Sequence, residues 1–194
     1  MGNRRLSRKR LLSLEKRGQK VTKSDLGMGA GMSGTFVRCN KMRDGSLVVV
    51  ELVLDLGTSA AVVASHAAND VIGVDGASGT IFTWDASIHG YLIDLEMLVL
   101  ETPTTGDDDL HIYYHSAEIN ANAAGNGGTD SAVDITTAVK GRSHSAAIGT
   151  GDLSSLQYFY IVSDGSTAGT YAAGKILIRT TGFVLDEDAT DTFV

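Results

Sequence analysis

The chain has 194 residues, a formal net charge of −7, 23 glycines, one proline and one cysteine. This length suits one domain of ordinary size plus a tail, and the single cysteine excludes both an intrachain disulfide and a zinc site built from several thiolates. The apolar runs contain acidic residues or are far shorter than the roughly 20 residues that cross a bilayer, so we expect no transmembrane helix.

The N-terminal segment differs in charge from the rest of the chain. Residues 1–25 contain nine basic and two acidic residues, a net charge of +7, which leaves −14 on the remainder. Because so many cations on a short segment seek an acidic surface or phosphates, the segment is predicted to anchor the protein to a partner; a disordered tail that aids solubility is the alternative. The segment lacks the continuous apolar run of a secretory signal, so we expect the protein to fold in a cytoplasm. The residues predicted to bind the partner are Arg4, Arg5, Leu6, Arg8, Lys9, Arg10, Leu11, Leu14, Lys16, Arg17, Lys20 and Lys23.

A short helix is predicted within this arm, capped by Ser7 and ended by Gly18, with a thin stripe of leucines on one side. Isolated helices shorter than about 12–15 residues are barely stable in water, so this helix should order only on a partner. The glycine-rich stretch 27–34 follows, and the conformational freedom of glycine predicts a flexible link there. We therefore expect residues 1–34 to form a basic arm with its link, and residues 35–194 to form the folded domain.

From residue 35 onward, short β-prone runs alternate with turn residues. Asp44-Gly45 predicts a hairpin between the run that begins at Thr35 and the run 47–56, which is rich in β-branched residues. The run 91–101 alternates polar and apolar side chains, as a strand with one exposed face does. About eight to nine strands without a convincing helix between them predict an all-β antiparallel sandwich, and a jelly roll is the first choice of topology. The other strands are predicted at 71–74, 80–84, 110–115, 133–139, 156–162 and 175–183.

Two patterns resemble ligand sites but lack the necessary context. The stretch from Gly29 to Gly34 matches the glycine fingerprint of dinucleotide-binding proteins. That fingerprint binds pyrophosphate only where a strand delivers it to a helix N-terminus, and here a β-prone segment follows, so we predict no cofactor. His111 and His115 share one face of a predicted strand, but they are about 13 Å apart at 3.3 Å per residue, which is too far for one metal ion.

Other reactive residues also lack the neighbours that catalysis needs. Residues 107–109 are three aspartates in a row, and without the alternating ligands of a hand-type calcium site they predict a solvated turn. Cys39 has no histidine near it in the sequence, and no Gly-x-Ser-x-Gly elbow occurs. We therefore predict no catalytic, cofactor-binding or metal-binding residue, and a protein that is not an enzyme.

Four stretches resemble a group of tailed-phage virion proteins, especially those of marine and cyanobacterial phages. The likeness lies in composition and position rather than in catalytic motifs. The stretches are Asn3–Ser7 with Leu14–Gly18, Arg43–Gly45 leading into Glu51–Gly57, Ala67–Val74, and Gly169–Ile178.

The resemblance implies a capsid decoration protein, also called a cement protein, that stabilises the bacteriophage shell without catalysis. Its jelly-roll body would sit on the outer surface of the capsid, often as a homotrimer, while the basic arm crosses the major capsid protein. The implied location is the virion, after synthesis in the host cytoplasm, with no membrane and no nucleic acid as partner. An acidic β-domain with a basic arm agrees with this layout, because repeated weak arm contacts give durable attachment to a lattice.

Three other functions remain open from the sequence. A receptor- or glycan-binding module of a head fibre or tail spike would use the loops at one end of the sandwich and would need a concave aromatic patch, yet Trp84 is the only tryptophan. A DNA-binding role would place the basic arm on packaged DNA inside the shell. An enzyme of unrecognised type is the third alternative.

Overall fold

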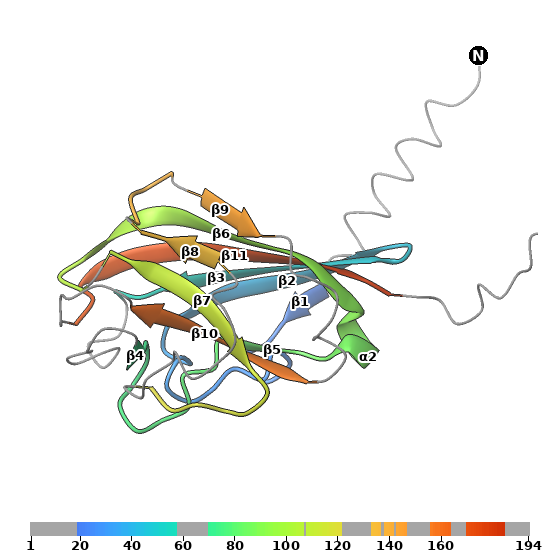
Figure 1. Ribbon diagram of the computed structural model, residues 1–194, viewed down its shortest axis with the longest axis horizontal. Coiled ribbons are helices and arrows are strands. Elements are labelled where there is room, and N and C mark those ends of the chain that lie inside the picture. Colours follow the sequence, from blue (N-terminus) through green and yellow to red (C-terminus); the bar gives the residue numbers. More distant parts are fainter. Residues whose placement is uncertain are drawn as a thin grey trace, which may run out of the picture.

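The computed structural model describes residues 19–57, 70–106, 108–121, 133–136, 138–141, 143–146, 156–163 and 170–184. Across these residues two antiparallel sheets pack against each other, and in Figure 1 the strands β7 (Leu110–His115), β8 (Val133–Ile135) and β10 (Gln157–Ser163) of one sheet overlap those of the other. The prediction of an all-β sandwich is confirmed. Within the described ranges the only helix is α2 (Ala86–His89), a single turn at one end of the sandwich.

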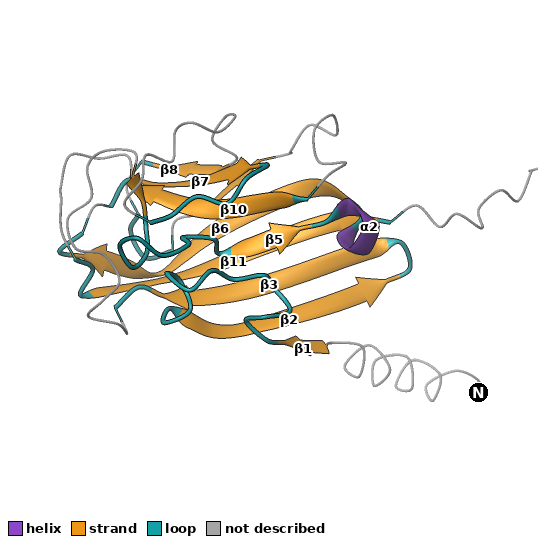
Figure 2. Ribbon diagram, turned by 90° about the horizontal axis from the view of Figure 1, so that it is seen from below, coloured by secondary structure: helices purple, strands orange, loops and turns teal. Residues whose placement is uncertain are grey.

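The large sheet has six strands, in the order β1-β2-β3-β11-β6-β9. β11 lies inside this sheet and pairs with β3 on one side and β6 on the other. Figure 2 shows β1 as a short strand at one rim of this sheet; the opposite rim is β9. The bounds are β1 (Gln19–Val21), β2 (Phe36–Asp44), β3 (Leu47–Asp55), β6 (Tyr91–Thr104), β9 (Ser143–Ala146) and β11 (Ala173–Phe183).

The small sheet has five strands, with β4, β10, β7 and β8 in that order and β5 paired to β10 beside them. Its longest strand is β10, which pairs over six residues with β7. The bounds are β4 (Asp70–Val71), β5 (Phe82–Trp84), β7 (Leu110–His115), β8 (Val133–Ile135) and β10 (Gln157–Ser163).

The predicted hairpin is present between β2 and β3. Asp44 pairs with Leu47, so the loop between them is Gly45 and Ser46. Gly45 has φ +60, a left-handed conformation that favours glycine and that matches the first position of a tight hairpin turn. The register that this turn sets places Cys39 opposite Leu52 and thereby decides which side chains of β2 face inward.

The facing sides of the two sheets form one apolar core. Along β11 buried and half-buried residues alternate, because successive side chains of a strand point to opposite faces. Phe82 of β5 and Phe159 of β10 stack with ring centroids 4.4 Å apart, and Trp84 is 1% exposed. Each fully buried aliphatic or aromatic side chain contributes roughly 1.5–3 kcal/mol, so this core is the main source of stability.

The glycine-rich stretch 27–34 belongs to the sandwich, so the prediction of a flexible link is wrong. The Gly29 N–H donates to the Thr80 carbonyl oxygen at 2.9 Å, and the Gly31 N–H donates to the Ser78 carbonyl oxygen at 2.8 Å. Met32 is fully buried. The glycines allow two backbone segments to pack closely and do not serve conformational flexibility, since a Cβ on Gly29 would lie 2.4 Å from the Ser78 carbonyl oxygen.

The boundary predicted between residues 34 and 35 therefore moves. β1 pairs with β2, and Val21 and Leu26 are buried in the core. The described folded domain begins at residue 19.

Candidate functional site

The predicted anchor is divided by this boundary. Lys20 lies in β1 opposite Asn40, and Lys23 lies in the turn that follows; both are exposed. They therefore belong to the folded domain rather than to the predicted arm, and their contact with a partner stays a prediction. β1 is at the rim of the large sheet, so the described part of the chain begins at that rim. The other ten predicted anchor residues, Arg4, Arg5, Leu6, Arg8, Lys9, Arg10, Leu11, Leu14, Lys16 and Arg17, lie outside the described residues.

Ion pairs cross the outer face of the large sheet. Arg179 of β11 bonds to Glu51 of β3 and to Glu96 of β6, each at 2.9 Å. These bonds raise the pKa of Arg179, with the hydrogen bond to Glu51 as the largest cause. On the same face, Lys175 of β11 forms ion pairs with Asp55 of β3 and Glu101 of β6. Such exposed pairs contribute about 0–1 kcal/mol each, so they fix side-chain geometry more than they stabilise the fold.

A row of apolar side chains crosses the same outer face nearer to α2. The register aligns Phe183 with Leu47 on one side and with Tyr91 on the other. Their exposed fractions are 38%, 42% and 39%. The next row inward, which includes Val48 and Leu92, is buried, so the exposed row lies on the outside of the sheet.

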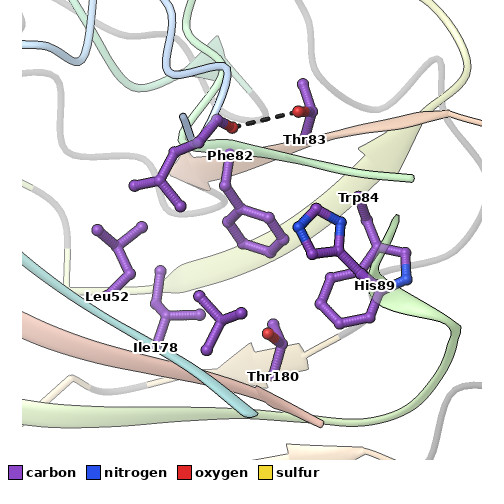
Figure 3. Close-up of a pocket in the computed structure, with 9 residues that line it drawn as sticks. Leu52, Phe82, Thr83, Trp84, His89, Ile178 and Thr180 are labelled. Carbon is purple, nitrogen blue, oxygen red and sulfur yellow. Dashed lines mark hydrogen bonds between the residues drawn. The ribbon is translucent and has the colours of Figure 1, made fainter. Parts of the chain in front are cut away.

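A pocket opens between the sheets beside α2. It has an outer part of about 310 Å³ and an inner part of about 10 Å³, and the two adjoin because both are lined by Leu26, Val50, Thr83 and His89. Figure 3 shows the inner part. The residues that line the inner part from opposite sheets are Phe82, Thr83 and Trp84 of β5, and Leu52, Ile178 and Thr180 of β3 and β11.

α2 places an imidazole in this pocket. Asp85 caps the helix by accepting from the Ser87 N–H at 2.8 Å, and Gly90 ends it with φ +76. The Asp85 N–H in turn donates to Nδ1 of His89 at 3.2 Å, so Nε2 carries the hydrogen of the neutral ring. Burial, reinforced by the positive charge of Lys41, lowers the pKa of His89 to about 4. At neutral pH His89 is therefore an uncharged hydrogen-bond donor.

The outer part of the pocket has charged groups at its wall and rim. Lys41 of β2 lies opposite Val50, whose side chain is 8% exposed, and it lines the pocket, so it faces inward from the sheet edge. Burial lowers the pKa of Lys41, and the charge of Arg43 adds to this effect. Asp25 and Asp85 lie at the rim, where each carboxylate accepts hydrogen bonds from its own turn.

Two polar groups of the pocket lack partners. Within the described ranges no carboxylate forms an ion pair with Lys41. Thr180 is 2% exposed, and its Oγ1 has no hydrogen-bond partner there either. Leaving a buried hydroxyl unsatisfied costs about 1–3 kcal/mol.

The sequence did not predict this pocket. The one available signal was the position of Lys41 in the hairpin, since a strand with Cys39 facing the core must also turn residue 41 inward. Thr180 gives no signal of its own, because threonine is common on both faces of strands.

The residues that the sequence singled out for chemistry do not converge. His111 and His115 both lie in β7, where His111 bonds to Asp109 at 3.0 Å and Nδ1 of His115 accepts from the Ala117 N–H. Cys39 is fully buried, and burial raises the pKa of its thiol to about 12. In the part of the chain that the structure describes, histidine, cysteine, aspartate and glutamate nowhere gather in threes close enough to hold a metal ion.

Two further findings bear on partners. Trp84 is buried, and its Nε1–H donates to the Gly90 carbonyl oxygen at 2.8 Å, so it is not a surface platform for a sugar ring. The described residues contain no helix with the length and apolar character needed to span a membrane. Comparison with protein-family models, with curated proteins and with solved structures finds no match to this chain.

Proposed function

We propose that this protein is a non-enzymatic decoration protein that stabilises the capsid of a tailed phage. In this proposal the sandwich sits on the outer surface of the shell, and the basic segment before β1 binds the major capsid protein. The observation that carries the proposal is the separation of charge along the chain, on either side of the start of β1. Residues 1–18 hold seven basic residues and one acidic residue, whereas the described domain beyond them is acidic.

The strand order supports a jelly roll as the topology of the body. Eight strands pair in a nested order: β3 with β11, β4 with β10, β6 with β9, and β7 with β8. This is the pairing of one long antiparallel hairpin that is rolled into two four-stranded sheets, which is the jelly-roll arrangement found in viral capsid and lectin domains. β1, β2 and β5 are additions to it.

The outer face of the large sheet supports a role in assembly. The exposed row of Leu47, Phe183 and Tyr91 lies on the same face as the charged pairs around Arg179, and interfaces typically combine an apolar centre with a polar rim. We assign this face to contacts between copies in a homotrimer. Substitution of Phe183 with Asp should then shift the protein from trimer to monomer in sedimentation, whereas a monomeric wild-type protein would contradict this assignment.

The test of the anchor compares equal changes of charge at two places. One variant reverses Arg4, Arg5 and Arg8 to glutamate; the control reverses Arg38, Arg43 and Lys140, which are exposed on the domain and lie outside the predicted anchor. Both are mixed with capsids assembled without this protein, and the bound fraction is measured after sedimentation. Because lattice attachment multiplies weak contacts, the arm variant should bind at least about tenfold more weakly, and the control should change little. Equal losses would show that total charge, not the arm, drives binding.

The position on the particle separates this proposal from its rivals. Electron microscopy of capsids with and without the protein should show added density on the outside. Density inside the shell would favour the DNA-binding alternative. Binding to host cells or glycans without binding to capsids would favour the receptor-binding module.

A further inference from the structure

The pocket beside α2 has no role in the proposed attachment to a capsid. It combines apolar walls with the buried Thr180 hydroxyl, which has no partner among the described residues, and with the half-buried Lys41 ammonium, which forms no ion pair there. Buried polar groups are normally satisfied, and an unsatisfied one calls for an explanation such as a bound ligand. Both groups belong to the large sheet, so its backbone fixes their relative position.

The two groups lie on one row of the sheet. Lys41 of β2 is opposite Val50 of β3, and Val50 is opposite Thr180 of β11. Neighbouring strands are about 4.8 Å apart, so the backbones of Lys41 and Thr180 are about 10 Å apart, with an apolar side chain between them. A ligand that satisfies both must be polar at each end and apolar in the middle.

We propose that this pocket binds a small monocarboxylic acid whose compact apolar body carries a hydrogen-bonding atom at its far end. The carboxylate pairs with the Lys41 ammonium in the outer part. The body lies over Val50 between the sheets, and the far atom reaches the Thr180 hydroxyl through the inner part, where about 10 Å³ leaves room for little more than one atom. The outer part, at about 310 Å³, lies at the small end of the range of ligand sites.

The remaining lining groups restrict the ligand further. Phe82, Trp84 and His89 form an aromatic wall, which favours a flat body. The neutral His89 ring offers a hydrogen-bond donor without adding charge. The carboxylates of Asp25 and Asp85 also line the outer part and repel negative charge, so the ligand carboxylate must lie at Lys41 and a second negative charge is disfavoured.

The position of Trp84 gives a direct measurement. It is the only tryptophan of the chain and it lines the pocket, so its fluorescence reports on this site alone. The probe is 3-(4-hydroxyphenyl)propanoate, which has a carboxylate at one end and a hydroxyl at the other. Two comparison compounds each lack one group: 3-phenylpropanoate lacks the hydroxyl, and 3-(4-hydroxyphenyl)propanamide lacks the charge. Calorimetry of the same titrations gives affinities that do not depend on the fluorescence change.

Two variants assign each end of the ligand to its residue. Lys41→Met should weaken binding of the acid about tenfold and leave the amide unchanged, because only the acid forms the ion pair. Thr180→Val should remove the preference for the hydroxylated acid over 3-phenylpropanoate. Thermal unfolding of both variants checks that the fold persists.

Several results would overturn the proposal: no binding of the probe, binding seen in calorimetry without a change in Trp84 fluorescence, or an affinity for the acid that Lys41→Met does not alter. The inference is independent of attachment to a capsid, since it is tested on the isolated full chain.

Discussion

Two parts of the space between the sheets differ in how they are filled. Around Met32, the glycine-rich stretch packs so closely against Ser78 that even a methyl group would not fit, and the buried Thr35 hydroxyl donates to the Met32 carbonyl oxygen at 2.7 Å. Around Thr180, a pocket remains and an equally buried hydroxyl has no partner among the described residues. The first part is optimised for packing. The second keeps an unsatisfied group, which is typical of positions retained for binding rather than for stability.

The largest effect is expected in the filled part. Gly29→Val would place its Cβ 2.4 Å from the carbonyl oxygen of Ser78. Because backbone cannot yield as a flexible side chain does, the free energy of unfolding should fall by about 3 kcal/mol or more. The matched control is Ala30→Val, one residue further along and exposed, which should change stability by less than about 0.5 kcal/mol. Urea denaturation of both variants measures the difference, and similar values for the two would contradict close packing here.

The pocket should make stability depend on pH. The pKa of His89 is about 4 in the folded protein and about 6.5 in the unfolded chain, so between these values the unfolded chain binds the extra proton. Stability is therefore full above pH 6.5 and falls as the pH drops towards 4. Since the ring is only half-buried, solvent screening weakens this effect, and we expect the free energy of unfolding to fall by about 1–2 kcal/mol over this range.

The control for this pH dependence is His89→Asn, whose amide oxygen can still accept from the Asp85 N–H but does not titrate. Urea denaturation between pH 7 and 4.5 should show a much flatter profile for this variant. An unchanged profile would mean that His89 is not the titrating group. Hydrogen bonds from Thr22 and Ser87 lower the pKa values of Asp25 and Asp85. These two carboxyl groups therefore reduce stability only when the pH falls below about 3.8, outside the range of this experiment.

A smaller loss is expected for Thr35→Val in the filled part. The substitution keeps the shape of the side chain but removes the hydrogen bond to the Met32 carbonyl oxygen, which retains its bond from the Thr35 N–H. The free energy of unfolding should decrease by about 1 kcal/mol. Thermal unfolding and urea denaturation both measure it, and a gain in stability would show that this hydroxyl is not needed.

In the pocket, Thr180→Val is expected to change the free energy of unfolding in the opposite direction, by a comparable or smaller amount. Replacing an unsatisfied buried hydroxyl by a methyl group removes a desolvation penalty, so stability should increase by up to about 1 kcal/mol. Together, the two threonine variants decide whether the two parts of the interior really differ. A loss of stability in both would mean that Thr180 has a partner after all.

The strands were predictable because their side chains alternate along the chain itself. The predicted runs 47–56, 91–101, 110–115 and 175–183 correspond to β3, β6, β7 and β11. The strand at 143–146 was not predicted, since Ser143–Ala146 has no apolar alternation and is held by pairing with β6.

The glycine-rich stretch shows what local patterns cannot supply. Its composition is that of a flexible linker, but the partners of Gly29 and Gly31 lie about fifty residues away at Thr80 and Ser78. No pattern within the stretch encodes such a contact. The pocket was missed for the same reason, because it depends on which strands become neighbours in the large sheet, and nothing local to β3 or β11 specifies that pairing.

The place of β11 has a consequence for how the protein is made on the ribosome. Residues 173–183 fill the gap between β3 (47–55) and β6 (91–104), so these two strands emerge long before the strand that joins them. Until then each presents an unpaired edge to the nascent chain and to other molecules. The large sheet is completed only when translation has passed residue 183, so an incomplete product that lacks β11 leaves both edges open to aggregation.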